Sequence, residues 1–384
     1  MAGRAPVRVL MDYRPALRSR TGAGEFTHEL ASALLARTAG DPARAIELTL
    51  FSSSWKDRLA LAPELRGAAA IDRRIPVSAL NLLWHRLEWP PAESLAGRPF
   101  DVVHSSHPLL MPSRQAAQVI TIHDLDFLAH PERTQAEIRR DYPALVRRHA
   151  ARADAIIVPS RFTAGEVARQ LAVPPERMAI CPPGAPAWSP RPHAPRHGYL
   201  LFFSTLEPRK NVGHLLDAYV RLLEDGPPPP PLVLAGNARP EAAAWLARLA
   251  EPPLAGHVRH IGYVPAQERE ALYAGATLLV MPSLDEGFGI PVLEAMAAGV
   301  PVVAANRGAL PEVLDGAGVL VDPLDPADIA AGLRRVYADE ATASACRDRG
   351  LARAGCFRWA ETARTVYDAY VRAIARRAAR RERP

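Results

Sequence analysis

The stretch from Ser283 to Gly299 reads Ser-Leu-Asp-Glu-Gly-Phe-Gly-Ile-Pro-Val-Leu-Glu-Ala-Met-Ala-Ala-Gly, and it carries the strongest indication of the fold. It follows Ala276–Met281, an apolar run that predicts a buried strand, and it continues into Ile290–Ala298, an apolar run with helical spacing. A strand, a glycine-rich turn and a helix together present backbone N–H groups to an anion at the helix N-terminus. The stretch therefore predicts an anion-binding turn.

Two carboxylates flank this turn: Glu286 at its mouth and Glu294 about one turn into the helix. Gly287 and Gly289 allow positive φ or close backbone approach, and Pro291 suits a first helical turn. A diphosphate on the amides, with hydroxyl groups on the carboxylates, indicates a sugar nucleotide as ligand. The alternative is an ordinary strand–turn–helix unit, since a helix start tolerates carboxylates in any case.

Glu286-Gly-Phe-Gly-Ile-Pro-Val-Leu-Glu294 resembles the two-glutamate motif of the family 4 retaining glycosyltransferases, and Gly299–Val313 continues the resemblance. That family has the GT-B fold and moves a hexose from a nucleotide diphosphate to an acceptor hydroxyl. The resemblance implies that Glu286 is catalytic and holds sugar hydroxyls, while Glu294 holds ribose hydroxyls. The other donor-binding residues that it implies here are Asp285, Gly287, Phe288, Gly289 and Ile290.

A second anion site is expected in Ser204-Thr-Leu-Glu-Pro-Arg-Lys-Asn-Val212, which closes the predicted strand 199–203. Arg209 offers forked donors and Lys210 a point charge, just before a predicted helix start. The segment resembles the diphosphate-binding Arg-Lys-Asn segment of the family. This implies catalytic roles for Arg209 and Lys210 and donor contacts for Ser204 and Thr205, although Ser204 stands where a glycine is common. An exposed basic pair on a loop is the structural alternative.

The first half of the chain holds a candidate catalytic histidine at the end of the predicted strand Val119–Ile122. His123 and Asp124 resemble the His-Asp pair of the family, whose histidine faces the donor sugar. Asp124-Leu-Asp126 also spells the metal-binding triad of the other major glycosyltransferase fold. Because Arg209, Lys210 and a helix N-terminus can already neutralise the charge of the diphosphate, we expect no metal and no other cofactor.

Further site residues are expected at other strand ends of the first half. Gly22 and Gly24 look like the N-terminal glycine loop of the family and are assigned to the donor, although Gly-x-Gly also forms simple turns. His104 and His107 end another predicted strand, and together with Asp124 they are assigned to the acceptor side.

Apolar strands and helical patterns alternate through both halves of the chain, which predicts an α/β protein with two Rossmann-like, doubly wound parallel sheets and a central cleft. A proline-rich stretch without periodicity separates the halves. The expected organisation is an acceptor-side domain over 1–184, a linker over 185–198 and a nucleotide-sugar-binding domain over 199–358. A final helix over 359–384 is expected to cross back to the first domain, by resemblance to GT-B enzymes.

Composition restricts the class of protein. At 384 residues with 48% hydrophobic content, the chain is long enough for two globular domains. No uncharged apolar run reaches about 18 residues, and the N-terminus lacks a signal-peptide core. The three scattered cysteines favour a reducing compartment over a disulfide framework. We therefore expect a cytoplasmic protein.

The charge of +6 lies almost entirely in the C-terminal tail, because residues 372–383 hold six arginines and one glutamate. With the rest of the chain nearly neutral, no nucleic-acid surface is expected. The tail can contact anionic lipid headgroups at the inner face of a membrane, or it can be a solvated helix end where arginine is favoured. The sequence leaves both readings open.

The expected partners are a sugar-nucleotide donor and a glycan acceptor. Residues 122–132 resemble bacterial mannosyltransferases that build surface polysaccharide, which favours GDP-mannose, with a UDP-hexose or dTDP-rhamnose as alternatives. The acceptor is expected to be a glycan or a lipid-linked glycan. A GT-B phosphorylase and a non-catalytic sugar-nucleotide-binding protein are the two alternative functions.

Overall fold

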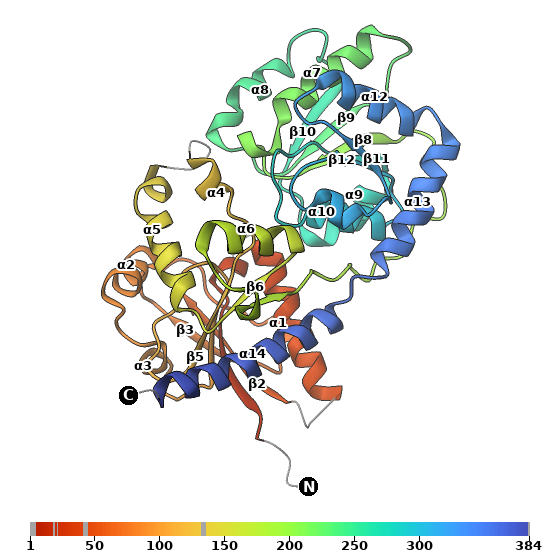
Figure 1. Ribbon diagram of the computed structural model, residues 1–384. Coiled ribbons are helices and arrows are strands. Elements are labelled where there is room, and N and C mark those ends of the chain that lie inside the picture. The colour runs from red at the N-terminus through yellow and green to blue at the C-terminus, as the bar shows by residue number, and fades with distance from the viewer. Residues whose placement is uncertain (1–4, 18–19, 21, 41–44, 132–135, 383–384) are drawn as a thin grey trace. The chain divides into compact units, whose positions relative to one another are not determined.

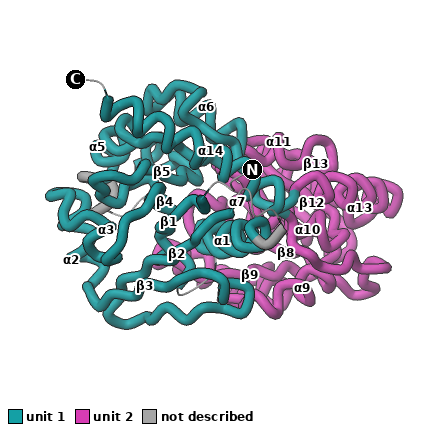
Figure 2. The backbone as a smooth tube through the Cα atoms, turned by 90° about the horizontal axis from the view of Figure 1, so that it is seen from below, with its two compact units in different colours: residues 1–184, 358–384 teal, residues 185–357 magenta. Residues whose placement is uncertain are grey.

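The computed structural model describes residues 5–17, 20, 22–40, 45–131 and 136–382; Glu132, the end of the 122–132 segment, lies outside them. The chain divides into two compact units (Figure 2). Unit 1 combines residues 1–184 with 358–384, and unit 2 is the single segment 185–357. The final helix is therefore part of unit 1.

Unit 1 is built on a parallel sheet of seven strands in the order β3-β2-β1-β4-β5-β6-β7. The strands are β1 (Val7–Asp12), β2 (Ile46–Ser53), β3 (Ala69–Arg73), β4 (Val102–Ser105), β5 (Ala117–Thr121), β6 (Ala155–Val158) and β7 (Met178–Ile180). One strand, β3, differs from the other six in its sequence. It is an edge strand, Ala-Ala-Ile-Asp-Arg, without a buried residue, so it lacks the apolar run that marks the others.

Helices cover both faces of this sheet. They are α1 (Ala23–Gly40), α2 (Val77–Leu82), α3 (Ala92–Ala96), α4 (Asp126–Ala129), α5 (Ala136–Arg152), α6 (Arg161–Leu171) and α14 (Trp359–Arg381). Along β1, Val9 and Met11 face a core with α1 and α14, whereas Leu10 faces the opposite core beside α2 and α3. Side chains of a strand alternate between faces, so apolar residues at successive positions require cover on both sides.

The last helix, α14, is held to unit 1 by its apolar face and by its arginines. Tyr370 is fully buried against the sheet. Arg376 donates to the carbonyls of Asp154 and Glu176, and Arg380 donates to the Asp154 carboxylate at 3.1 Å. These arginines anchor the helix, whose ribbon lies beside β5 and β6 (Figure 1). Contact between the tail and anionic lipid stays a prediction.

Unit 2 has a second parallel sheet, in the order β10-β9-β8-β11-β12-β13. Its strands are β8 (Tyr199–Phe203), β9 (Leu232–Ala235), β10 (Val258–Gly262), β11 (Ala276–Met281), β12 (Val302–Ala305) and β13 (Val319–Val321). Its helices are α7 (Val212–Glu224), α8 (Ala243–Arg248), α9 (Ala266–Ala274), α10 (Ile290–Ala297), α11 (Leu310–Leu314), α12 (Pro326–Tyr337) and α13 (Glu340–Ala354). The chain order turns at β8, whose two neighbours are β9 and β11, and ligands bind at the carboxyl edge beside such a switch point.

The proline-rich stretch 185–198 lies in unit 2 and packs against it. Arg191 is buried there, and its guanidinium donates to the carbonyls of Gly299 and Ala276. Burial is the main reason that the pKa of Arg191 is lowered to about 10. In the described part of the chain, no helix combines the length and the apolar character needed to cross a bilayer.

Candidate active site

The turn after β8 is locked onto the loop after β11. Asn211 adopts a left-handed conformation with φ 60°, which asparagine tolerates better than most residues. Its side-chain amide donates to the carbonyls of Pro282 at 3.1 Å and Pro323 at 2.7 Å. The Leu284 N–H donates to the Arg209 carbonyl at 2.8 Å. The Arg209–Lys210 pair is therefore fixed beside the glutamate turn.

The loop after β12 holds the backbone of Glu286 by one hydrogen bond and one close packing contact. Its carbonyl accepts from the Ala309 N–H at 2.8 Å. Gly308 has φ +60°, and a Cβ there would lie 2.6 Å from the Glu286 nitrogen, so this close approach requires glycine. This contact explains physically why a glycine stands in the motif continuation 299–313.

Glu286, Lys210 and Arg209 form a nearly buried charge cluster. The Lys210 ammonium lies 2.6 Å from Glu286 Oε1, and the Arg209 guanidinium lies 3.7 Å from Oε2. Burial raises the pKa of Glu286, but the charges of Lys210 and Arg209 outweigh burial and hold that pKa below its usual range. Glu207 lies 3.4 Å from Arg209 at the more exposed edge. The cluster holds an ionised carboxylate and two cations at the helix start.

Glu294 is held by a different set of partners, on α9. The Tyr273 hydroxyl donates to one carboxylate oxygen at 2.8 Å, and the Arg269 guanidinium donates to the other at 3.3 Å. Burial and the charge of Glu294 raise the pKa of Tyr273 well above its usual value, so the hydroxyl stays protonated and donates. The guanidinium of Arg269 also lies over the Phe203 ring, 5.7 Å from its centre. These contacts fix Glu294 in a single orientation.

The remaining donor-side candidates lie on the same edge of unit 2. Gly289 caps α10 with φ 96°, and a Cβ there would meet Leu310 at 2.6 Å, so glycine is required. The ring of Phe288 is buried against Phe357, at 5.5 Å between ring centres, so only its backbone is suited to ligand contact. Four further candidates are half-buried on this edge: Ser204, Thr205, Asp285 and Ile290. Gly287 is buried in the same turn.

In unit 1, His123 lies two residues after Thr121, the last residue of β5. Its ring packs edge-on against Phe26, at 5.2 Å between centres. Burial is the main cause that lowers the pKa of His123 to about 4, with a smaller contribution from His107, so the imidazole is neutral near pH 7. Among the described residues, Nε2 of His123 has no hydrogen-bond partner although it is buried. Such an atom is expected to find a partner in a ligand or in water.

His104 is a core residue, and we leave it out of the acceptor site. It is fully buried, and its two ring nitrogens are hydrogen-bonded to the hydroxyls of Tyr370 and Thr121, both at 2.8 Å. Side chains along β4 alternate between the two faces of the sheet. The His104 ring therefore lies on the face that α14 covers, inside the core and away from the carboxyl edge where a ligand would bind. Burial lowers the pKa of His104 to about 3.

His107 belongs to a cluster at the carboxyl edge of unit 1. Its Nε2 lies 3.2 Å from the buried Asp12 carboxylate, and its Nδ1 accepts from the Leu109 N–H. The Arg14 guanidinium forms an ion pair with the same carboxylate at 2.7 Å. Burial raises the pKa of Asp12, but the Arg14 charge and the His107 contacts outweigh it and hold that pKa far below its usual range.

The other first-unit candidates flank this edge. Gly22 adopts φ 47° immediately before α1, whereas Gly24 is already helical, so the two do not form one continuous loop. Part of the preceding segment lies outside the described residues. Asp124 is half-buried beside His123. Within the described ranges, no group of three or more His, Cys, Asp or Glu side chains is arranged to hold a metal ion.

Sequence reasoning missed Arg269, Tyr273, Asp12 and Arg14. Arg269 and Tyr273 stand four apart in α9, a spacing that puts both side chains on one face of a helix. Nothing in the sequence indicates that this face meets Glu294. Asp12 is visible as a carboxylate at the end of a buried strand, but its partner His107 is far away in the chain and is reached only through the sheet order.

Known families match both halves of the chain. The model described as "Glycosyltransferase Family 4" matches residues 20–188, and the one described as "Glycosyl transferases group 1" matches residues 190–353. The chain is also similar to the O-antigen chain mannosyltransferase B of Escherichia coli. These two chains are 30% identical over 299 residues, which cover 74% of this chain and 78% of that relative.

Two further proteins support the same grouping. An MMP alpha-(1->4)-mannosyltransferase of Mycolicibacterium hassiacum is 32% identical over 312 residues, which cover 75% of each chain. The fold resembles that of sucrose-phosphate synthase from Thermosynechococcus elongatus, with a TM-score of 0.76 and 20% identity over 96% of this chain and 99% of that one. The protein therefore belongs to the group 1, family 4 glycosyltransferases and has the GT-B fold predicted from the Glu286–Glu294 motif.

Proposed function

We propose that the protein is a retaining hexosyltransferase that moves mannose from GDP-mannose to an acceptor hydroxyl of a growing glycan. The observation that carries this proposal is the buried cluster of Lys210, Arg209 and Glu286 at the start of α10. In such a cluster the two cations can bind a diphosphate while the carboxylate accepts hydrogen bonds from sugar hydroxyls. The mannosyltransferase names of the two relatives at 30% and 32% identity support the choice of sugar.

The proposed reaction breaks the bond between the anomeric carbon of the sugar and the β-phosphate oxygen. Negative charge then builds on that phosphate, and Arg209, Lys210 and the backbone amides near Gly287–Gly289 stabilise it. The donor competes with Glu286 and Glu207 for the two cations, which are already positioned and therefore need little reorganisation.

Glu286 and Glu294 are assigned to opposite ends of the donor. Glu294, whose carboxylate accepts hydrogen bonds from Arg269 and Tyr273, is held in position to accept hydrogen bonds from the ribose hydroxyls. Glu286 holds sugar hydroxyls and stabilises the positive charge that develops on the ring. Following the family resemblance, the acceptor hydroxyl attacks on the face that the leaving phosphate vacates, and this phosphate takes its proton. No residue is assigned as a covalent nucleophile.

The first unit supplies the residues assigned to the sugar and the acceptor. His123 keeps its catalytic assignment from the resemblance, supported by a neutral imidazole whose Nε2 has no partner among the described residues. His107 and Asp124 remain the acceptor-side candidates.

The test is a thermal-shift panel of GDP-mannose, UDP-glucose, UDP-GlcNAc and dTDP-rhamnose, followed by turnover with the donor that binds best. A donor present at about 100 times its Kd stabilises the folded protein by about 2.7 kcal/mol. We expect GDP-mannose to raise the Tm most, and the anomeric configuration of the product to match that of the donor by NMR. Stabilisation by a UDP or dTDP donor alone refutes the GDP-mannose assignment, and inversion refutes the retaining mechanism.

A further inference from the structure

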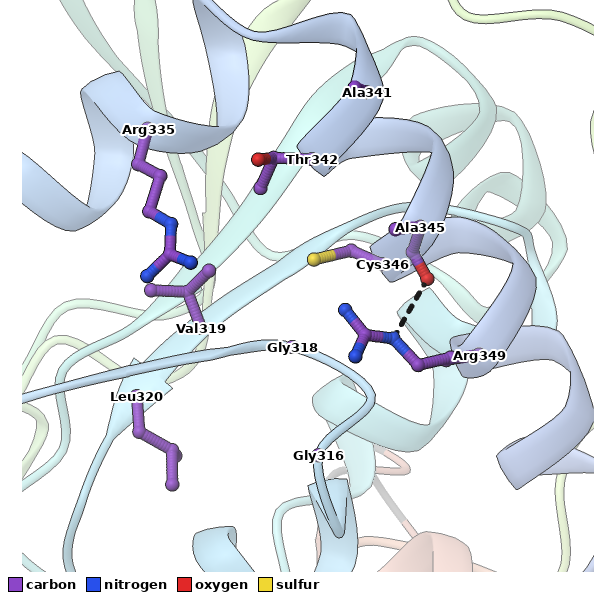
Figure 3. Close-up of a pocket in the computed structure, with 10 residues that line it drawn as sticks. All are labelled: Gly316, Gly318, Val319, Leu320, Arg335, Ala341, Thr342, Ala345, Cys346 and Arg349. Carbon is purple, nitrogen blue, oxygen red and sulfur yellow. Dashed lines mark hydrogen bonds between the residues drawn. The ribbon is translucent and has the colours of Figure 1, made fainter.

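A pocket of about 470 Å³ lies in unit 2, away from the loops that carry the glutamates. Its walls come from α12, α13 and the chain that leads into β13 (Figure 3). Gly316 and Gly318 line it just before β13 begins at Val319, so the pocket is at the amino end of that strand. The donor loops follow the carboxyl ends of β8 and β11, at the opposite edge of the same parallel sheet. The pocket is therefore separate from the donor site.

Two guanidinium groups face this pocket. Arg335 extends from the last turn of α12 and Arg349 from α13, and Figure 3 shows both directed toward the Gly318–Val319 segment. Arg349 Nε donates to the Ala345 carbonyl at 3.1 Å, which orients its two terminal nitrogens into the space. Both positive charges act on the Cys346 thiol in the pocket wall. The two arginines therefore share one small volume.

No carboxylate is among the residues that line this pocket. In the parts of the chain that the structure describes, neither arginine has a carboxylate oxygen within ion-pair distance. Asp339 lies near the rim, but its oxygens accept from the Thr342 hydroxyl at 2.6 Å and the Ala341 N–H at 3.0 Å. The Thr342 hydrogen bond is the main cause that lowers the pKa of Asp339, and the charge of Arg335 contributes to a smaller extent, so this exposed carboxylate is a counter-charge beyond ion-pair distance. Two like charges that share one concavity, with no closer carboxylate among the described residues that line it, favour an anionic ligand.

The uncharged lining indicates that the ligand is more than a bare anion. Val319, Leu320, Ala341, Ala345 and Cys346 provide an apolar wall beside the two guanidinium groups. Burial raises the pKa of the Cys346 thiol, which makes it a poor nucleophile, so this wall is suited to binding and not to covalent chemistry. A volume of about this size falls in the range of small-molecule sites.

We propose that this pocket binds a small phosphorylated molecule. Its phosphate group is held by Arg335 and Arg349, and its uncharged remainder lies against the wall formed by α13 and β13. Guanidinium groups recognise phosphate with paired N–H donors, and two of them match the charge of a monoester dianion. The site neither overlaps the proposed donor site nor depends on the identity of the donor.

Calorimetric titration of the full chain tests the proposal, with glucose 1-phosphate, glucose and inorganic phosphate as probes. We expect the sugar phosphate to bind more tightly than inorganic phosphate, and glucose not to bind. Arg335→Gln and Arg349→Gln should each weaken binding of the sugar phosphate about tenfold or more, and the double variant about 100-fold. Both side chains are exposed, so these variants are expected to fold normally.

Arg334→Gln is the matched control, because Arg334 is the neighbour of Arg335 on α12 and does not line the pocket. Its affinity for the sugar phosphate should equal that of the wild type. Arg209→Ala separates this site from the donor site and should also leave the affinity unchanged. The proposal is overturned if no probe binds at millimolar concentration, or if inorganic phosphate binds as tightly as the sugar phosphate. It is also overturned if binding survives the double variant or disappears in Arg209→Ala.

Discussion

Replacing Glu286 by alanine should affect catalysis and stability together, because this carboxylate belongs to a buried ion-pair cluster and is proposed to hold the donor sugar. Its side chain is 8% exposed and lies 2.6 Å from the Lys210 ammonium, which is 9% exposed. We expect kcat to fall about 10²-fold or more, corresponding to roughly 2.7 kcal/mol of lost transition-state stabilisation. The physical reason is that a carboxylate on the sugar interacts more strongly as the ring gains positive charge.

The stability effect follows from the charge that Glu286→Ala leaves behind. Removing one partner of a buried ion pair typically costs about 3–5 kcal/mol, because the other charge remains without compensation. For a domain of this size each kcal/mol lowers the Tm by about 2–4 °C, so we expect a fall of about 6 °C or more. Replacing both partners, with Lys210→Met and Glu286→Leu, should restore most of the Tm while kcat stays low.

Donor-varied steady-state kinetics and thermal unfolding in the same buffer measure the two effects, with the kinetics recorded well below the lowest Tm. Asp217→Ala is the matched control. Asp217 pairs with Arg248 at 2.7 Å in the same unit, but both side chains are about 40% exposed. Its removal should cost less than about 1 kcal/mol and leave kcat unchanged. Wild-type kcat in Glu286→Ala would refute the catalytic role, and a double variant as unstable as the single one would refute the charge argument.

Three further outcomes are expected. Glu294→Ala should mainly raise the donor KM, since ribose contacts change little during reaction, and Arg269→Gln should raise it less; an unchanged KM in both variants would contradict the ribose assignment. Turnover should survive excess EDTA, and a loss that Mn²⁺ restores would make Asp124 and Asp126 metal ligands. Burial lowers the pKa of His104 in the folded state, so protonation of this residue favours unfolding. The contribution of neutral His104 to the free energy of unfolding is therefore complete above about pH 6.5 and declines as the pH falls toward 3. Between about pH 6.5 and 5 this amounts to about 2 kcal/mol, and the loss of Tm on acidification should be smaller in His104→Gln; equal losses would contradict this.

The sequence allowed most strands of both sheets to be predicted, because buried parallel strands appear as continuous apolar runs. Elements with little buried surface were missed. The edge strand β3 exposes most of its residues, and α13 is rich in small and charged side chains. Its N-terminus did carry a usable signal, since Asp339 caps the helix by accepting from the Ala341 N–H. That aspartate could have marked the start of the helix.

The candidate site was predictable as a set of residues, but not as a set of contacts. The motif residues Arg209, Lys210 and Glu286 could be named from local sequence, because each follows a strand at the ligand-binding edge. Their ion pairs depend on the order β8-β11, which places loops 76 residues apart side by side. His104 was misassigned for a related reason. Its position near a strand end indicates a ligand edge, yet the alternation of β4 directs the ring into the core, against Tyr370.

The two glutamates of the motif differ most in what holds them, and this difference supports the division of roles. Glu294 is fixed by Tyr273 and Arg269, which also packs over an aromatic ring, so its position should not depend on whether donor is bound. Glu286 is held by Lys210 and Arg209, the two cations that an incoming diphosphate would attract. Donor binding should therefore weaken the ion pairs of Glu286 and release its carboxylate toward the sugar, so the phosphate itself would free the group that we propose to be catalytic.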